Sequence, residues 1–400
     1  MPSPISGPTP VLFTHFGEEW LTGAEYVLLD LLAHLDPARI SPVVWCNGAP
    51  LAEKCRAAGY PTYRSQFAFF LDYPESASPF SARHYAALVR EGVSLIRQHG
   101  IGVVHANSAA PTQWLVPAAG WTRRPLLTHL HVRYLRRSRY ALLLHQADLI
   151  VGVAQEVTRD LPGDGYDPAR LSTIYNGIDP SRLKNANPAA LRARLGIPDG
   201  VPVVGCTGSL IQRKGHDVLL RAFAAQPARG PLPHLVIAGS GAEGEALAAL
   251  AGELRLSGRV HFAGHIPDPA SLYAISDVFA LASRREGLPL SLAEAGWFGL
   301  PSVATGVGGV AEILLNGETG FVVPSEDHAA FGAALARLLD DPALRARMGG
   351  AARARVDAGF TVQRMAEEFM VAYEALSKQG ARSLLQTSRV RCYLPKYIRV

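Results

Sequence analysis

The chain has 400 residues and a net charge of +5, a size that suits two domains rather than one core. The thinly spread charge argues against a nucleic-acid partner. Because no segment reaches the ~20 apolar residues that span a bilayer, and the first ten residues lack a basic region, we expect neither a membrane helix nor a signal peptide. The four cysteines form no Cys-x-x-Cys pair, which predicts reduced thiols in a cytoplasmic protein.

Short apolar runs alternate with segments of helical periodicity in the first half of the chain. Residues 24–35 show this best, with Val27, Leu28, Leu31 and Leu32 on one stripe. Such alternation predicts a parallel sheet with helices on both faces. The expected strands are 11–16, 43–46, 103–106, 126–130 and 149–153.

The alternation weakens at residues 176–200, where prolines and glycines interrupt a polar stretch with one short helix at 189–195, and then restarts. Expected strands follow at 201–207, 235–238, 260–263, 278–282, 302–304 and 320–323. Expected helices are 217–225, 243–254, 288–298, 329–339 and 344–379.

Two α/β halves in tandem indicate two Rossmann-like domains. We predict an N-terminal domain at 1–180, a linker at 181–200, a nucleotide-binding domain at 201–358, a helix at 359–380 that packs back on the first domain, and a basic tail at 381–400. Ligands of such sheets bind beyond the carboxyl ends of the strands, so the cleft between the halves is the expected site.

Two glutamates eight positions apart, Glu286 and Glu294, stand out. The first lies in a turn after an expected strand, and the second lies in the helix that follows. Carboxylates accept strong hydrogen bonds from sugar and ribose hydroxyls. Pro289 suits a first helical turn, and the free N–H groups of Leu290 and Ser291 then favour a pyrophosphate. The alternative is two surface glutamates on an amphipathic helix.

A second pattern is the loop at residues 208–215, which lies between an expected strand and a helix. Its adjacent cations, Arg213 and Lys214, can hold a diphosphate, the arginine as a fork and the lysine as a point charge. A solvated basic turn is the alternative interpretation.

Residues 283–294 resemble the E-x7-E signature of the family 4 retaining glycosyltransferases. The resemblance runs from about residue 12 to 376 and implies the GT-B fold, with two parallel-sheet Rossmann-like domains facing across a cleft that closes about a hinge near Gly177 and Asp179. It assigns the donor sugar to Glu286 and the nucleotide ribose to Glu294. Leu288–Pro289 stands where the family has Phe-Gly, which puts Leu288 beside the donor, and Ser209 stands where it has arginine.

The resemblance also assigns two residues of the first half. Gly23, in a loop similar to the family's Gly-Gly-Ala-Glu, would approach the donor phosphates or the acceptor, although Thr22 replaces one glycine. His131, at the end of an expected strand, matches the family's active-site histidine, and His129 faces the same way. A satisfied core histidine is the alternative, and Glu25 could be a helix-start charge.

Arginines and tyrosines gather at residues 123–140. This basic segment and the tail could contact an anionic acceptor or a peripheral membrane surface, or could be solvated. The G-x-G-x-x-G at 239–244 lacks the acidic residue that a nicotinamide enzyme needs about 20 positions on, so we interpret it as a turn.

These patterns together predict a glycosyltransferase that moves a sugar from a nucleoside-diphosphate-sugar donor to a glycan or lipid-linked acceptor with retention. No Asp-x-Asp or histidine cluster is placed to bridge phosphates, so we expect no metal or other cofactor. We expect attack by the acceptor hydroxyl on the donor's front face, since no carboxylate is placed as a nucleophile. A nucleotide-sugar epimerase and a non-catalytic nucleotide-binding protein are the alternatives.

Overall fold

The computed structural model describes residues 7–68, 81–184, 186–226, 232–266 and 269–379. The predicted basic tail at 381–400 lies outside these residues. The chain forms two compact units, one made of residues up to Asn176 together with the segment from Val362 onward, and one made of Gly177–Thr361. We call them unit 1 and unit 2.

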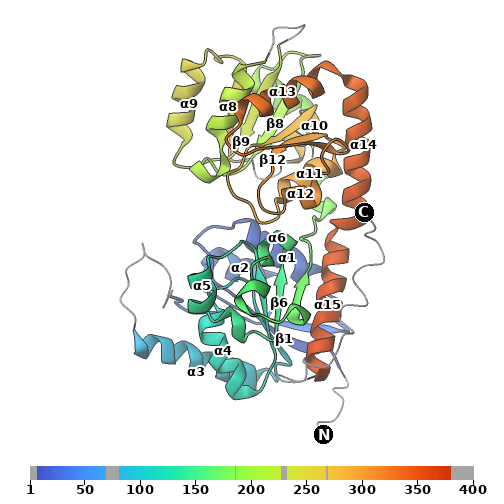
Figure 1. The fold of residues 1–400 in the computed structure, drawn as a ribbon. Helices are drawn as coiled ribbons and strands as arrows, with labels where there is room; N and C mark the ends of the chain where they lie inside the picture. The colour runs from blue at the N-terminus through green and yellow to red at the C-terminus, as the bar shows by residue number, and fades with distance from the viewer. Residues whose placement is uncertain (1–6, 69–80, 185, 227–231, 267–268, 380–400) are drawn as a thin grey trace. The chain divides into compact units, whose positions relative to one another are not determined.

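Unit 1 is built on a parallel seven-stranded sheet in the order β3-β2-β1-β4-β5-β6-β7 (Figure 1). Every residue of β4, β5 and β6 is buried, because helices cover both faces of a parallel sheet. The strands are β1 (Thr9–His15), β2 (Ile40–Cys46), β3 (Thr62–Arg64), β4 (Val103–Ala106), β5 (Leu126–Leu130), β6 (Leu149–Gly152) and β7 (Leu171–Thr173).

Most helices of unit 1 connect its strands, and the last one, α15, comes from the C-terminal part of the chain. They are α1 (Gly23–His34), α2 (Ala49–Ala57), α3 (Ala82–Gln98), α4 (Thr112–Thr122), α5 (Arg136–Ala141), α6 (Gln155–Thr158) and α15 (Val362–Gln379). Short 3₁₀ turns are η1 (Leu144–Gln146), η2 (Pro162–Asp164) and η3 (Pro168–Arg170).

The helix α15 packs on α1, β1 and β4 of unit 1. Arg39, just before β2, pairs with Glu374 at 2.6 Å and with Glu367 at 2.7 Å. Inside this contact, the buried hydroxyl of Tyr373 lies 2.7 Å from His105 Nδ1 on β4. Unit 1 is therefore completed by a segment that follows unit 2 in the sequence.

Unit 2 contains a parallel six-stranded sheet in the order β10-β9-β8-β11-β12-β13 (Figure 1). Its central strands β8 and β11 pair side by side, so their carboxyl ends lie together. The strands are β8 (Val203–Thr207), β9 (His234–Ala238), β10 (Val260–Gly264), β11 (Val278–Leu281), β12 (Ser302–Thr305) and β13 (Gly320–Val323).

Helices of unit 2 begin at residues that the sequence marks as caps. Asn187, Asp327 and Asp341 each accept a backbone N–H from the first turn of the helix they precede. The helices are η4 (Pro180–Leu183), α7 (Pro188–Leu195), η5 (Gln212–Lys214), α8 (His216–Ala224), α9 (Gly244–Glu253), α10 (Ala270–Ile275), α11 (Leu290–Trp297), α12 (Val310–Ile313), α13 (His328–Asp340) and α14 (Pro342–Gly359).

The structure corrects two expected helices. The helical segment expected at 344–379 is two helices, which meet near the start of the separate helix expected at 359–380, because Phe360 leaves helical geometry and Thr361 forms a parallel bridge with Ile178. The helix expected at 288–298 begins at Leu290, and Pro289 is its N-cap with extended backbone, since proline fixes φ and donates no hydrogen bond. The strands β3 and β7 were not expected.

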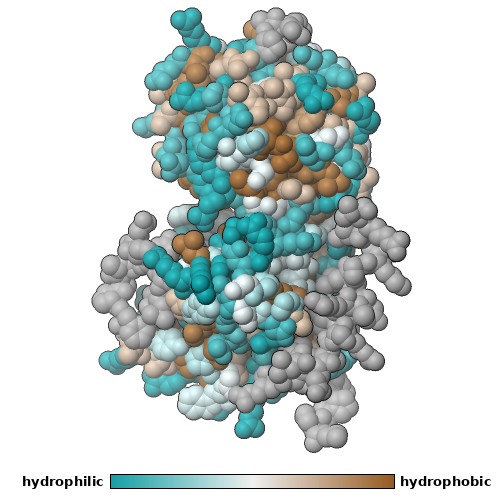
Figure 2. All heavy atoms as spheres, in the orientation of Figure 1, coloured by the Kyte–Doolittle hydropathy of each residue, from teal (hydrophilic) through white to brown (hydrophobic). Residues whose placement is uncertain are grey.

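Hydrophilic residues cover most of the face shown in Figure 2, and hydrophobic ones gather on unit 2 where Figure 1 labels α10 and α11. Among the described residues, none of the helices combines the length and hydrophobicity needed to cross a bilayer.

Candidate active site

Glu286 lies at the carboxyl end of the unit 2 sheet, in the turn between β11 and α11. Its side chain is 7% exposed, and it is held by two donors to one oxygen. Lys214 Nζ and Ser283 Oγ each lie 2.7 Å from Glu286 Oε1, and Arg213 Nη1 lies 3.6 Å from Oε2. The structure thus brings the predicted sugar-binding carboxylate together with both predicted diphosphate cations.

The basic loop reaches this position because its backbone packs directly on β11. Gly215 has φ +63°, and a Cβ there would lie 2.0 Å from the carbonyl oxygen of Ala282. Only glycine permits this approach. Arg213 also donates to the carbonyl of Arg285 at 3.0 Å. Two segments 70 residues apart in sequence therefore form one small cationic surface beside Glu286.

Glu294 is the fifth residue of α11, and its carboxylate accepts a 2.6 Å hydrogen bond from the hydroxyl of Tyr273 on α10. Burial, and then the adjacent Glu294, raise the pKa of Tyr273 well above its usual value, so this hydroxyl stays protonated and donates. The bond fixes the direction of the carboxylate. No local pattern marks Tyr273, because it comes from another helix.

The helix α11 begins at Leu290 and Ser291 without a side chain that caps it. Uncapped N–H groups and the helix dipole favour an anion at this end. Leu288 is buried, so a donor could meet only its backbone. The N–H groups predicted to bind an anion, those of Leu290 and Ser291, therefore lie at the start of α11, directly after Pro289.

A second group of predicted residues lies in unit 1, at the carboxyl ends of β1, β4 and β5. His129 Nδ1 and His131 Nε2 each lie 3.2 Å from Asn107 Oδ1. His129 is fully buried, whereas His131 is partly exposed. Asn107 thus lies at the centre of a histidine cluster, and the sequence did not mark it.

The same asparagine connects His131 to the loop before α1. Asn107 Nδ2 lies 2.9 Å from His15 Nδ1, and His15 Nε2 lies 2.8 Å from Glu25 Oε1. Glu25 Oε2 in turn accepts from the backbone N–H and the hydroxyl of Thr22. Glu25 is therefore a buried partner of His15, in addition to being an acidic residue in the first turn of α1. Gly23 is the exposed first residue of α1, with open space around it.

Two family descriptions match this chain. Glycosyltransferase Family 4 matches residues 21–182, and Glycosyl transferases group 1 matches residues 189–355. The GDP-mannose-dependent alpha-(1-6)-phosphatidylinositol monomannoside mannosyltransferase of Mycolicibacterium smegmatis is 32% identical over 330 residues, which are 77% of this chain and 82% of that protein. This chain belongs to the family 4 glycosyltransferases.

Further relatives agree with this assignment. A GDP-mannose-dependent monoacylated alpha-(1-6)-phosphatidylinositol monomannoside mannosyltransferase of Corynebacterium glutamicum is 31% identical over 68% of this chain and 76% of its own length. Among solved structures, Anabaena Alr3699/HepE in complex with UDP has a TM-score of 0.79 at 22% identity, covering 92% of this chain and all of that one. A Rickettsia africae glycosyltransferase gives 0.78 at 20%, covering 93% and 99%. The predicted GT-B fold is confirmed.

Two members of the unit 1 histidine cluster of this glycosyltransferase, His131 and Glu25, have pKa values below their usual range. Burial, and then repulsion from His15, lower the pKa of His131 to about 3. Burial alone would raise the pKa of Glu25, but hydrogen bonds from His15 and Thr22 lower it to about 2. At neutral pH His131 is therefore an uncharged imidazole, which can orient a hydroxyl but does not supply a positive charge.

The basic segment of the glycosyltransferase is less available than its composition suggested. Arg133 pairs with Asp160 at 2.7 Å, and Arg136 pairs with Asp164 at 3.2 Å. The side chain of Arg139 is 7% exposed and also pairs with Asp164. These arginines hold the segment after β6 against α5, so part of the predicted anionic contact surface is internal structure.

One further residue links the donor-site loops. Arg284 forms two hydrogen bonds to Asp217 on α8 and pairs with Glu326, and its backbone N–H donates to the carbonyl of Arg213 at 2.8 Å. Hydrogen bonds from Arg284 lower the pKa of Asp217. Arg284 thus holds the basic loop of this glycosyltransferase against the turn that contains Glu286. The only sequence signal for this role is that Arg284 lies two positions before Glu286.

The G-x-G-x-x-G stretch also packs on the basic loop. A Cβ at Gly239 would lie 1.9 Å from the carbonyl oxygen of Gly208, and a Cβ at Gly241 would lie 2.4 Å from that of Leu210. These glycines serve close packing of two backbones at the carboxyl ends of β8 and β9.

Proposed function

We propose that this glycosyltransferase moves a sugar from a nucleoside-diphosphate-sugar to an acceptor hydroxyl with retained anomeric configuration. The observation that carries the proposal is the contact of Glu286 with Lys214 and Arg213. It places a carboxylate that can accept hydrogen bonds from hydroxyl groups beside two cations. A nucleotide-sugar offers those two chemistries, hydroxyls and a diphosphate, on neighbouring atoms.

Each group has a distinct task in this proposal. Arg213, Lys214 and the first N–H groups of α11 stabilise the negative charge that develops on the leaving diphosphate. Glu286 accepts hydrogen bonds from the donor sugar, and Glu294, held by Tyr273, accepts them from the ribose. The side-chain cations supply the positive charge at the phosphates, so we assign no metal to the reaction.

Unit 1 supplies the acceptor side of the proposal. Uncharged His131 orients a sugar or acceptor hydroxyl, and front-face attack by that hydroxyl gives retention. The two mannosyltransferase relatives are named for phosphatidylinositol monomannosides, which favours a lipid-linked or glycan acceptor here. Leu135, 69% exposed beside the arginines of α5, favours peripheral contact with a membrane that carries such an acceptor.

A thermal-shift panel of UDP, GDP, ADP and their common sugar conjugates, with and without chelator, tests the donor site first. We expect one base to raise the melting temperature, Lys214→Ala to abolish the shift, and chelator to change nothing. Glu318→Ala, an exposed carboxylate on a turn, is the matched control. Product analysis then decides retention. Binding without transfer or donor hydrolysis would favour a non-catalytic protein, and conversion of the donor sugar without an acceptor would favour an epimerase.

A further inference from the structure

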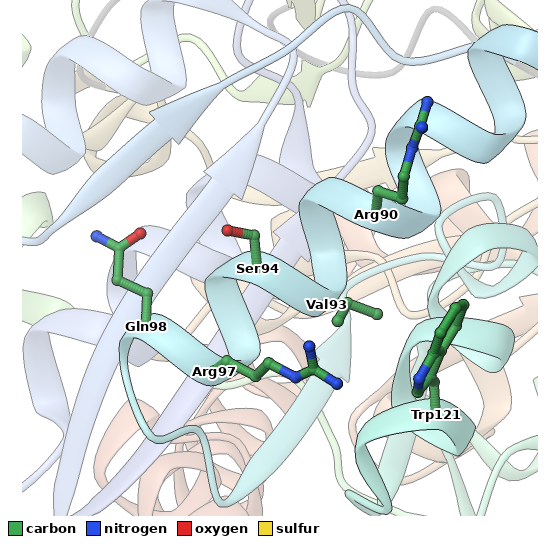
Figure 3. Close-up of a pocket in the computed structure, with 6 residues that line it drawn as sticks. All are labelled: Arg90, Val93, Ser94, Arg97, Gln98 and Trp121. Atoms are coloured by element: carbon green, nitrogen blue, oxygen red, sulfur yellow. The ribbon is translucent and has the colours of Figure 1, made fainter.

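A groove of about 570 Å³ lies between α3 and α4 of unit 1, and no role in transfer involves it. It is lined by Arg90, Val93, Ser94, Arg97, Gln98 and Trp121. Its volume falls within the range of small-molecule sites, which is roughly 300–1,000 Å³. Figure 3 shows the groove with the guanidinium of Arg97 extending from α3 toward the indole of Trp121 on α4, and Val93 between them.

The groove lies apart from the histidine cluster. The helices α3 and α4 run back toward the edge of the sheet where β4 and β5 begin, and Arg97, Gln98 and Trp121 stand at their final turns. His129 and His131 lie at the opposite ends of the strands. A ligand here would leave the predicted transfer residues of unit 1 uncovered.

Two features of the groove lack a structural explanation. Trp121 is 69% exposed, although an indole is a large, mostly apolar side chain of the kind that usually packs in a core. Arg90 and Arg97 are exposed, and neither pairs with a carboxylate in the part of the chain that the structure describes; Arg90 Nε donates to the carbonyl of Ala86 at 3.3 Å. The helix dipole favours Arg97 in the last turn of α3, but Arg90 lies mid-helix.

Arg97 and Trp121 carry the chemistry of the groove. Figure 3 shows Arg90, Ser94 and Gln98 extending from α3 away from Trp121, and the amide of Gln98 donates to the hydroxyl of Tyr63 at 3.0 Å. The guanidinium of Arg97 favours a phosphate or carboxylate. The face of an exposed indole stacks on the apolar face of a flat or cyclic ligand.

We propose that this groove is a second binding site, for a sugar or cyclic polyol ring that carries a phosphate or carboxylate. The ring stacks on Trp121, and the anionic group bonds to Arg97. This goes beyond the proposed transfer reaction, because binding here requires neither the donor nor catalysis. Such a group could come from a soluble glycan or from a lipid headgroup.

Titration calorimetry with four probes separates the ring from the charge. Glucose 6-phosphate and glucuronate carry both, glucose carries only the ring, and inorganic phosphate carries only the charge. We expect the first two to bind at least about tenfold more tightly than the last two, because only they offer both the ring and the charge; tenfold corresponds to about 1.4 kcal/mol. Equal binding of phosphate and glucose 6-phosphate would overturn the proposal.

Three variants assign any binding to the groove. Arg97→Glu and Trp121→Ala should each weaken glucose 6-phosphate binding about tenfold or more, and Trp121→Phe, which keeps a stacking ring and the fold, should recover most of it. Arg83→Glu is the matched control, an exposed arginine on the same helix that does not line the groove. Loss of binding with Arg83→Glu equal to that with Arg97→Glu would reduce the site to general charge attraction and overturn it.

Vesicles distinguish the two sources. Binding to phosphatidylcholine vesicles that contain phosphatidylinositol, absent from phosphatidylcholine alone and lost in Arg97→Glu, would assign the site to a lipid headgroup. Binding of the soluble probes alone would assign it to a free glycan. If neither the vesicles nor the soluble probes bind in a manner that depends on Arg97, the proposal fails. None of these outcomes depends on sugar transfer, so the proposed function is tested separately.

Discussion

The amine of Lys214 lies 2.7 Å from the carboxylate of Glu286, in a contact that joins two loops 72 residues apart. Without a donor, the lysine is neutralised by the carboxylate. A bound diphosphate would share the lysine, so the two ligand-binding groups restrain one another. Their removal should have opposite consequences for nucleotide affinity.

Glu286→Gln should therefore reduce transfer much more than it weakens nucleotide binding. We expect at least about a 100-fold loss in kcat, as when one electrostatic contact to a transition state is removed. The affinity for the free nucleoside diphosphate should stay the same or rise, because Lys214 loses its competing partner. Steady-state kinetics and calorimetry measure the two, with Glu318→Gln as the control. Equal losses in both quantities would refute a sugar-specific role.

Tyr273→Phe should weaken recognition of the ribose. Without the hydroxyl that lies 2.6 Å from Glu294, the carboxylate can rotate, and we expect a loss of a few-fold in affinity, the size of one hydrogen bond. The loss should vanish with a 2′,3′-dideoxy nucleotide, which offers no ribose hydroxyl. Tyr166→Phe removes another buried hydroxyl, bonded to Ala147 in unit 1, and serves as the control. A loss that is equal for both nucleotides would contradict the assignment.

Asn107→Asp should change the pH dependence of transfer. A carboxylate 3.2 Å from His131 would raise the pKa of that histidine from about 3, because it stabilises the imidazolium. Activity should then decline at a higher pH than in the wild type as pH falls. Asn107→Ala removes the same contact without adding charge, so it should lower kcat and leave the acid limb unmoved. Identical pH profiles for the two variants would exclude this role.

Unit 1 should lose stability in mild acid. Burial lowers the pKa of His105 to about 3, whereas the unfolded chain keeps about 6.5, so the unfolded state binds more protons between these values. The stability is complete above pH 6.5 and falls as pH drops, by up to about 1.4 kcal/mol per pH unit for this group. His129 and His131 act in the same direction. Glu25 adds its own loss only below pH 4.5, because its folded pKa is lower still.

Urea unfolding at pH 7, 6 and 5 measures this slope, followed by tryptophan fluorescence, since Trp45 and Trp114 are buried in unit 1. His105→Asn should reduce the dependence on pH. His328→Asn, on an exposed position of unit 2, should not. A wild-type stability that is flat from pH 7 to 5 would show that the buried histidines titrate normally.

The sequence was sufficient for most of the strands, with β3 and β7 the exceptions, and for the charged residues of unit 2. The expected strands at 103–106, 126–130 and 320–323 have those bounds in the structure, because strands covered by helices on both faces appear as short, mostly apolar runs. Glu286, Arg213 and Lys214, which were assigned to different parts of one donor, also lie together.

The partners of those residues could not be predicted. Asn107 and Tyr273 act through contacts with residues distant in sequence, and neither belongs to a local pattern. The local sequence favours a continuous helix through Phe360, and only the domain boundary expected at 359 marked the break, which comes from the bridge of Thr361 to Ile178. Periodicity reports which face of an element is apolar and is silent on which polar groups meet.

The position of α15 has a consequence for synthesis of the protein. A ribosome makes the whole of residues 177–361 before it reaches the helix that covers β1 and β4. At about 5–20 residues per second this takes on the order of ten to forty seconds. During that interval Phe13 and His105 lack the covering side chain of Tyr373, whereas unit 2, which is continuous, can complete first. The nascent first half is therefore the part that would depend on a chaperone, and a nonsense codon anywhere before residue 362 would leave it unfinished.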